Sequence, residues 1–180
     1  MSFDPAILVV PGVRSLQPYQ PGKNIEELER ELGISGIVKL ASNENPRAPS
    51  ASVGRAVTQM LPELSRYPDG GGFYLKQALA DQLAVAPGQI TLGNGSNDVL
   101  ELITRAFVRP GQGVIVAQHS FAVYTLAAKS VGADLRVVPA IRWGHDLEGM
   151  AEAVDGETRI VFIANPNNPT GTWVSRDALI

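Results

Sequence analysis

Four short apolar segments recur between residues 89 and 164, and an amphipathic segment separates each from the next. The apolar segments cover residues 89–93, 113–118, 134–140 and 159–164. Their apolar residues follow one another without polar alternation, which is typical of strands buried on both faces of a parallel sheet. The intervening segments fit helices and cover residues 96–107, 121–131 and 146–154. This order predicts an α/β fold in which a mainly parallel sheet is covered by helices.

The helix expected over residues 96–107 has the clearest apolar spacing. Residues three and four positions apart fall on one side of an α-helix, and we expect that side to be the buried one. The residues on it are Val99, Leu102, Ile103, Ala106 and Phe107.

The chain before residue 89 is less regular. The expected elements are an arm over residues 1–15, helices at 24–32 and 73–84, a strand at 37–40, a loop at 41–50, a helix ending near Leu61, and a turn at 66–72. Asn24, with Glu27 three positions later, suits a capping box at the start of the first helix, and Gly33 suits its end.

The composition narrows the classes of function. A chain of 180 residues is long enough to bury a core, and its net charge of −3 argues against binding to nucleic acid. It has no cysteine, which excludes disulfides, thiol catalysis and zinc–thiolate sites, and we expect no metal site. No apolar run approaches the roughly 18 residues of a membrane helix, so we expect a cytoplasmic protein.

Three polar loops follow predicted strands, where ligands of parallel sheets bind. In the first, Gly93 and Gly95 permit a tight turn, and Ser96 and Asn97 begin a helix. The free N–H groups and the positive dipole end of such a helix suit a phosphate. The same stretch also fits an ordinary glycine turn before a capped helix, since no Gly-Lys-Ser/Thr follows.

The second loop carries aromatic residues at the start of a helix. Phe121 can lie over a planar ring at the edge of the sheet, although core packing explains this residue equally well. His119 is a candidate general base, and a surface histidine at the end of a strand is the simpler interpretation.

The third loop, residues 162–171, is rich in asparagine and proline. Pro166 and Pro169 fix their own φ angles and bias Asn165 and Asn168 toward extended conformations. An amide held in this way can donate a hydrogen bond to an anionic oxygen. The three loops together suit a ligand with a phosphate, an aromatic ring and an anionic oxygen, and pyridoxal 5′-phosphate has these parts.

Four motifs occur in an order and spacing that resemble the fold-type I pyridoxal-phosphate aminotransferases, and within them the histidinol-phosphate aminotransferases. They are LASNENP at 40–46, RYPDG at 66–70, GNGSNDVLELITRAF at 93–107 and NPNNPTG at 165–171. The resemblance implies an N-terminal arm and the start of a small domain in residues 1–45. It also implies that residues 46–180 form the first part of a large cofactor-binding domain.

The resemblance also implies roles for individual residues. Asn168 matches the asparagine that bonds the phenolic oxygen of pyridoxal 5′-phosphate, and Phe121 matches the aromatic residue stacked on its ring. Ser96 and Asn97 match the residues that hold the phosphate. Tyr67 matches a tyrosine that reaches the cofactor of the neighbouring subunit, which implies a homodimer. The substrate-side positions of the family correspond to Tyr19 and Asn43.

The function implied by the resemblance is transamination of histidinol phosphate with 2-oxoglutarate in histidine biosynthesis. The family often has Pro-Thr-Tyr where this chain has residues 119–121, and this departure leaves the substrate open. An aromatic aminotransferase, a threonine-phosphate decarboxylase and a non-catalytic phosphate-binding fragment are the alternatives.

Two observations indicate the first part of a longer protein. Residues 175–180 begin a helix capped by Ser175, but a helix of this length does not hold itself together. In addition, no lysine of the chain matches the context of the family's Schiff-base lysine, which we expect beyond Ile180. The lysines are Lys23, Lys39, Lys76 and Lys129. We therefore expect the 180 residues alone to be catalytically inactive.

Overall fold

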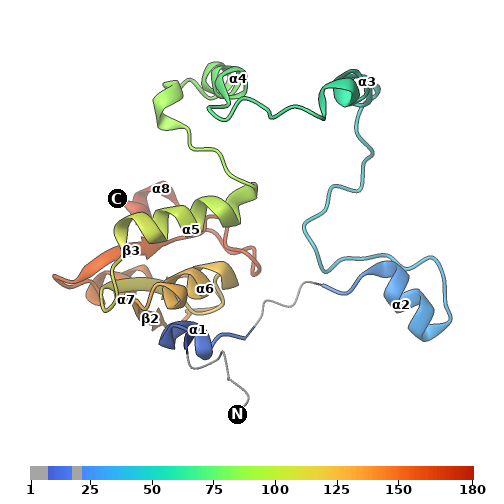
Figure 1. Cartoon of the computed structure of the whole chain (residues 1–180). Coiled ribbons are helices and arrows are strands. Elements are labelled where there is room, and N and C mark those ends of the chain that lie inside the picture. The colour runs from blue at the N-terminus through green and yellow to red at the C-terminus, as the bar shows by residue number, and fades with distance from the viewer. Residues whose placement is uncertain (1–7, 18–21) are drawn as a thin grey trace, which may run out of the picture. The chain divides into compact units, whose positions relative to one another are not determined.

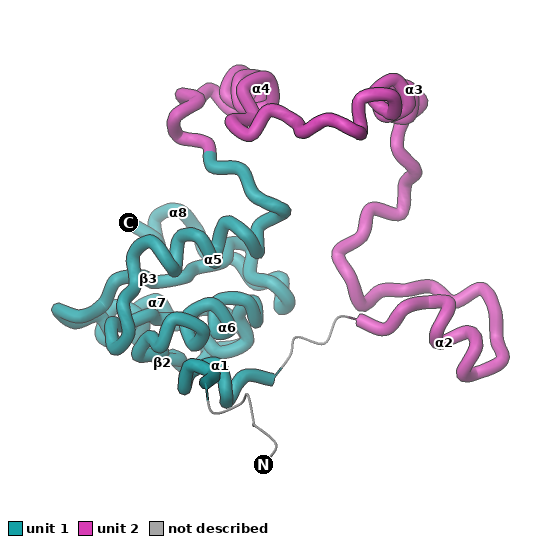
Figure 2. The backbone as a smooth tube through the Cα atoms, viewed as in Figure 1, with its two compact units in different colours: residues 1–18, 91–180 teal, residues 19–90 magenta. Residues whose placement is uncertain are grey.

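A computed structural model describes residues 8–17 and 22–180, and the chain divides into two compact units (Figure 1, Figure 2). Unit 1 joins the segment up to residue 18 to residues 91–180, and unit 2 is formed by residues 19–90. The domain boundary expected after residue 45 stays a prediction. Within the described residues, no helix is both long and apolar enough to cross a membrane.

Unit 1 is an α/β structure, as predicted. Its elements are α1 (Pro11–Arg14), α5 (Gly95–Phe107), β1 (Gly113–Ala117), α6 (Ala122–Ser130), β2 (Asp134–Val138), α7 (Leu147–Glu152), β3 (Thr158–Phe162) and α8 (Arg176–Leu179). The three strands form one parallel sheet in the order β2-β1-β3. Ala117 pairs with Val138 on one side, and Val116 pairs with Phe162 on the other, so the three carboxyl ends lie at one edge.

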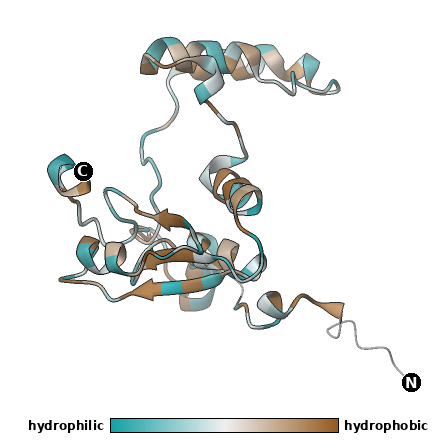
Figure 3. Ribbon diagram, turned by 90° about the vertical axis from the view of Figure 1, so that its left-hand side faces the viewer, coloured by the Kyte–Doolittle hydropathy of each residue, from teal (hydrophilic) through white to brown (hydrophobic). Residues whose placement is uncertain are grey.

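The core of unit 1 lies on both faces of β1. Successive side chains of a strand point to opposite faces, so Val114 and Val116 face the α6 side while Ile115 and Ala117 face Met150 of α7. All five residues of β1 are buried, and Figure 3 shows hydrophobic residues along the strands. This central strand therefore fixes the edge on which the loops are mounted.

Unit 2 is helical in its described part. Its elements are α2 (Ile25–Leu32), α3 (Ala51–Met60), the 3₁₀ helices η2 (Leu61–Glu63) and η3 (Pro87–Gln89), and α4 (Phe73–Leu83). Gly33 ends α2 in the left-handed conformation, as predicted. The cap of α2 is different from the predicted capping box, because Asn24 Oδ1 accepts from the N–H of Glu26 and no bond from Glu27 closes it.

Several sequence predictions are wrong. Residues 37–40 and 89–93 form no strand, since neither segment has a neighbouring strand to pair with among the described residues. In the first segment Leu40 is 91% exposed. The predicted apolar face of α5 is largely exposed, with Phe107 at 65%, whereas Thr104 is buried. The arm also contains the short helix α1, which packs against α6.

Candidate active site at the carboxyl edge of the sheet

The segment after β3 is closed into a loop by the side chain of Asn165. Its Nδ2 donates to the carbonyl of Val174 at 2.9 Å, and its Oδ1 accepts from the N–H of Val174 at 3.1 Å. Inside this loop the N–H of Asn167 donates to Thr172 O at 2.7 Å, and that of Gly171 donates to Asn167 O at 2.8 Å. The Asn165 amide thus bonds both the N–H and the carbonyl of Val174, as the main chain of a neighbouring strand would. These bonds hold the proline-rich loop in one conformation.

The same loop is joined to the segment after β1. Asn167 is 4% exposed, and its Nδ2 donates to the carbonyl of His119 at 3.1 Å. His119 has a φ of 60°, which is uncommon outside glycine. Its ring lies 4.8 Å from that of Trp143, in the turn after β2. The loops that follow all three strands therefore contact one another, and His119 links them through its carbonyl and its ring, although the residue stays exposed.

The start of α5 is built by a glycine turn. Gly95 has a φ of 78°, and a Cβ at Gly93 would lie 3.0 Å from that of Asp98. Asp98 Oδ2 accepts from the N–H of Asn94 at 3.0 Å, which closes the turn. No described residue hydrogen-bonds the side chain of Ser96 or Asn97, which follow Gly95. The N–H groups of the first turn have no partner within a helix, so this end offers donors to an anion.

The direction of α5 places these N–H donors at the carboxyl edge of the sheet, where the loops lie. A short connection leads from α5 into β1, and Leu100 of α5 packs on the core, so the helix runs back along the sheet. Figure 1 shows the start of α5 on the same side of unit 1 as the segment after β3.

Phe121 is the N-cap residue of α6 and belongs to a row of three aromatic rings. It contacts Tyr124 edge-to-face at a centroid distance of 5.8 Å, and Tyr124 stacks on Phe162 at 4.5 Å with an interplanar angle of 3°. Burial raises the pKa of the Tyr124 phenol. The row ties the Phe121 ring to the end of β3, while Phe121 itself stays half-buried. A planar ligand at this edge would meet an aromatic side chain of fixed orientation.

The predicted site residues fall in different parts of the chain. Ser96, Asn97, Phe121 and Asn168 all belong to unit 1, at the loop edge of its sheet. Asn168 is half-buried, and no described residue hydrogen-bonds its amide.

The remaining predicted residues belong to unit 2 or lie outside the described residues. Asn43 and Tyr67 belong to unit 2 and are exposed, with Tyr67 at 102%. Tyr19 lies outside the described residues. The roles expected for these three side chains stay predictions.

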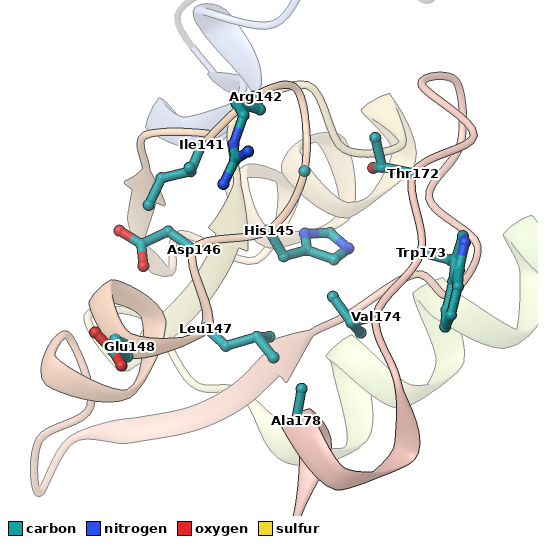
Figure 4. A pocket seen from close by; sticks show the side chains of 11 residues that line it. Ile141, Arg142, His145, Asp146, Leu147, Glu148, Thr172, Trp173, Val174 and Ala178 are labelled. Carbon is teal, nitrogen blue, oxygen red and sulfur yellow. The ribbon is translucent and has the colours of Figure 1, made fainter.

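A cavity of about 480 Å³ lies beside this edge, between the turn after β2 and the end of the loop after β3 (Figure 4). The His145 ring occupies its middle, and His145 Nε2 lies 2.8 Å from the carbonyl of Ala164, so that the ring braces the start of the loop. None of the predicted site residues lines the cavity.

Sequence reasoning missed the residues that shape the loop from within. They are Asn167, Thr170 and Thr172, and His145 of the segment after β2, which braces the loop from outside, was missed as well. The run of three asparagines was a signal that the loop needs amide groups. It did not show which of them bind the protein and which one stays free.

Comparison with known proteins identifies the family. Residues 35–179 match the family described as aminotransferase class I and II. The chain belongs to this family.

Relatives within the aminotransferase family are similar over nearly the whole chain. The chain is 57% identical over 174 residues to histidinol-phosphate aminotransferase 2 of Pseudomonas aeruginosa, covering 96% of the chain and 47% of the relative. It is 55% identical over 181 residues to the protein of the same name in Pseudomonas fluorescens, covering 99% and 49%. The chain thus spans about half the length of the curated relatives that it matches.

Solved structures agree with the α/β fold of unit 1. Histidinol-phosphate aminotransferase from Sinorhizobium meliloti, solved in complex with pyridoxal-5′-phosphate, superimposes with a TM-score of 0.81 and 32% identity, over 94% of this chain and 45% of that one. Aspartate aminotransferase from Thermotoga maritima superimposes with a TM-score of 0.78 and 23% identity, over 95% and 49%, and this likeness concerns the fold alone. The predicted parallel sheet covered by helices is confirmed as that of the aminotransferase family.

Proposed function

We propose that this chain contributes the cofactor-positioning part of a pyridoxal-phosphate-dependent aminotransferase that acts on histidinol phosphate, with 2-oxoglutarate as the amino acceptor. The observation that carries the proposal is the set of unengaged groups at the carboxyl edge of unit 1. The Ser96 hydroxyl and the amides of Asn97 and Asn168 bond to no described residue, although each stands on a tightly braced turn.

These groups fit pyridoxal 5′-phosphate part by part. The start of α5, with Ser96 and Asn97, supplies neutral donors for the phosphate. Phe121 supplies an aromatic face for the pyridine ring, and Asn168 supplies an N–H donor for the phenolic oxygen. When bound, the cofactor withdraws electrons from the carbon that bears the amino group of the substrate. The residues of this chain hold and orient the ring and leave proton transfer to other groups.

The names of the relatives support the choice of substrate. Relatives that are 55–57% identical are named histidinol-phosphate aminotransferases, and their names concern the substrate of those proteins. The acceptor 2-oxoglutarate, the homodimer with Tyr67 reaching the partner's site, substrate contacts by Tyr19 and Asn43, and the cytoplasmic location are parts of the same proposal.

Absorption spectroscopy of the purified intact protein tests cofactor binding. We expect a visible band with added pyridoxal phosphate, and borohydride should then fix the cofactor to a lysine other than the four of this chain. A protein that never gains visible absorption contradicts the proposal.

Substrate turnover is the second arm of the test. We expect turnover of histidinol phosphate with 2-oxoglutarate to exceed that of aromatic amino acids, and we expect no decarboxylation of threonine phosphate. A preference for aromatic amino acids, or decarboxylation of threonine phosphate, would be compatible with the proposed cofactor site but would contradict the proposed substrate.

A further inference from the structure

The amide of Asn167 joins the loop after β3 to the loop after β1, and Thr170 and Thr172 connect it further to the turn after β2. We propose that Asn167 is a positioning residue, which holds Phe121 and Asn168 at a fixed separation. The inference rests on the proposed cofactor site, in which those two side chains face the ligand. Asn167 itself is 4% exposed and is directed into the protein.

The orientation of the Asn167 amide is dictated by its neighbours. The carbonyl oxygen of His119, 3.1 Å away, can only accept a hydrogen bond, so the NH₂ group must face it. The second N–H of the same group donates to Thr170 Oγ1 at 2.8 Å. Asn167 Oδ1 points elsewhere and is buried without a partner among the described residues. Both N–H groups of the amide therefore donate hydrogen bonds within the protein.

The second proton starts a hydrogen-bond chain with a defined direction. Thr172 Oγ1 lies 3.2 Å from the carbonyl of Trp143, which can only accept, so the Thr172 proton points there. Thr170 and Thr172 share a contact of 2.9 Å, and Thr170 must be the donor because the Thr172 proton is already used. The chain runs from Asn167 through two hydroxyl groups to the turn after β2. Each hydroxyl group accepts one hydrogen bond from the preceding residue of this chain and donates one to the next.

This arrangement acts on both ligand-facing side chains. His119 stands two positions before Phe121, and Asn167 immediately precedes Asn168. Pro166 and Pro169 flank Asn167 and Asn168 and have no N–H to donate, so side-chain bonds supplement the main-chain bonds of the loop. Loss of the Asn167 donors would remove the direct hydrogen bond between the loop after β1 and the loop after β3.

The substitution Asn167→Asp in the intact protein tests the inference. It keeps the size of the side chain but removes both donors and places a carboxylate oxygen against His119 O. In cofactor-free protein we expect amide hydrogen exchange to rise about tenfold, which is about 1.4 kcal/mol, in segments 118–121 and 166–172. Exchange in β1 should stay unchanged. Spectroscopic titration should show pyridoxal phosphate bound about tenfold more weakly.

Two threonine variants are the matched controls. Thr172→Val removes the bonds of Thr172 to Thr170 and to Trp143 O but leaves both donors of Asn167 in place. We therefore expect faster exchange in 141–145 while 118–121 stays protected, and Thr172→Ser should restore the parent pattern. If Asn167→Asp fails to fold, Thr170→Val removes the hydrogen bond between Asn167 Nδ2 and Thr170 Oγ1. It should raise exchange in 166–172, while 118–121 stays protected by the bond to His119 O.

The outcomes separate this inference from the proposed function. If the parent never binds pyridoxal phosphate, the proposed function fails, while the exchange pattern still tests the loop coupling. Parent-like exchange and affinity in Asn167→Asp would overturn the positioning role. A uniform rise in exchange that includes β1 would also overturn it, because it would show a general loss of stability.

Discussion

At the scale of the single residue, the three asparagines of the loop after β3 divide the work between them. Asn165 bonds the main chain of Val174, and Asn167 bonds His119 and Thr170. Asn168 bonds no described residue. An amide that is held on a braced loop but left without a partner is suited to a ligand, because binding then costs little further ordering.

Substitution of Asn168 by alanine should affect the cofactor and leave the fold intact. A hydrogen bond to an anionic oxygen is worth about 1.5–3 kcal/mol. One pH unit corresponds to about 1.36 kcal/mol. We therefore expect the apparent pKa of the cofactor's visible band to rise by about one to two units, because the deprotonated form loses a donor. A spectroscopic pH titration measures this pKa.

The thermal midpoint of the cofactor-free Asn168→Ala protein is the control, and it should stay near that of the parent. Asn165→Ala should lower the midpoint, since it breaks both bonds to Val174. An unchanged or lowered pKa in Asn168→Ala would assign the phenolic oxygen to another donor.

The sequence could predict the candidate site only in part at this scale. The proline and asparagine pattern pointed to a rigid loop with amide donors, and the resemblance pointed to Asn168. The side chains of Asn165 and Asn167 hydrogen-bond partners that are 9 and 48 residues away in sequence, and only the folded chain brings these residues together.

At the scale of elements, local signals were sufficient where packing agreed with them. The strands β1, β2 and β3 were predicted from their apolar runs, and each forms because it lies beside another strand. Residues 37–40 have the same apolar character, yet a strand exists only through a partner's hydrogen bonds. The prediction that the apolar side of α5 is buried was wrong for a related reason. Spacing predicts which residues share a side of a helix, but burial depends on what covers that side.

The edge strand β2 is joined to the turn before β3 by Arg136. Its guanidinium contacts Asp134 at 2.9 Å and Asp155 at 2.7 Å, and it also donates to the carbonyl of Ala153 at 2.9 Å. The hydrogen bond from Arg136 is the main cause that lowers the pKa of Asp155 from 3.8 to about 2.

Substitution of Arg136 by glutamine should destabilise the protein in a pH-dependent way. A carboxyl whose pKa is lowered by folding contributes stability above its unfolded pKa, and that stability is lost as the pH falls through the folded pKa. We expect Arg136→Gln to lower the thermal midpoint by a few degrees at pH 7. The difference from the parent should shrink as the pH falls from about 4 to about 2.

Thermal melting of both proteins across this pH range measures the effect. Arg159→Gln is the matched control, because Arg159 Nη2 lies 3.9 Å from Glu157 at the surface and exposed pairs of this kind contribute little. A difference between Arg136→Gln and the parent that is independent of pH would show that the ion pair to Asp155 is not its cause.

At the scale of the whole molecule, the chain spans about half the length of its curated relatives, and it leaves much apolar surface exposed. The exposed apolar residues of unit 2 include Val57, Leu64 and Tyr74. Surface of this kind in a monomer commonly marks an interaction with another segment or subunit. The lack of transaminase activity in residues 1–180 alone stays a prediction.

Subunit mixing tests the proposed dimer. Tyr67 is fully exposed, and the proposal places it in the partner's site. We expect Tyr67→Ala and Asn168→Ala each to impair turnover, because each damages both sites of its homodimer. In a mixed dimer, one site combines the intact Asn168 of one chain with the intact Tyr67 of the other. Mixing the two variants should therefore restore up to about half of the activity per mixed dimer, since one of its two sites is intact.

Turnover is measured after the subunits have exchanged, and mass spectrometry of differently tagged chains shows that exchange has occurred. If mixed dimers remain as impaired as the homodimers of the two variants, Tyr67 and Asn168 of the same subunit serve the same site.

The closure of the loop by Asn165 and Val174 has a consequence for how this protein can diverge. The segment between these residues is a ring of fixed circumference, since both ends are bonded to one another and Asn167 anchors its middle. An insertion or deletion inside the ring would break the closure, whereas a change of length after Val174 would not. Variation in length among descendants of this sequence should therefore accumulate outside residues 165–174, even though the segment has the composition of an ordinary surface loop.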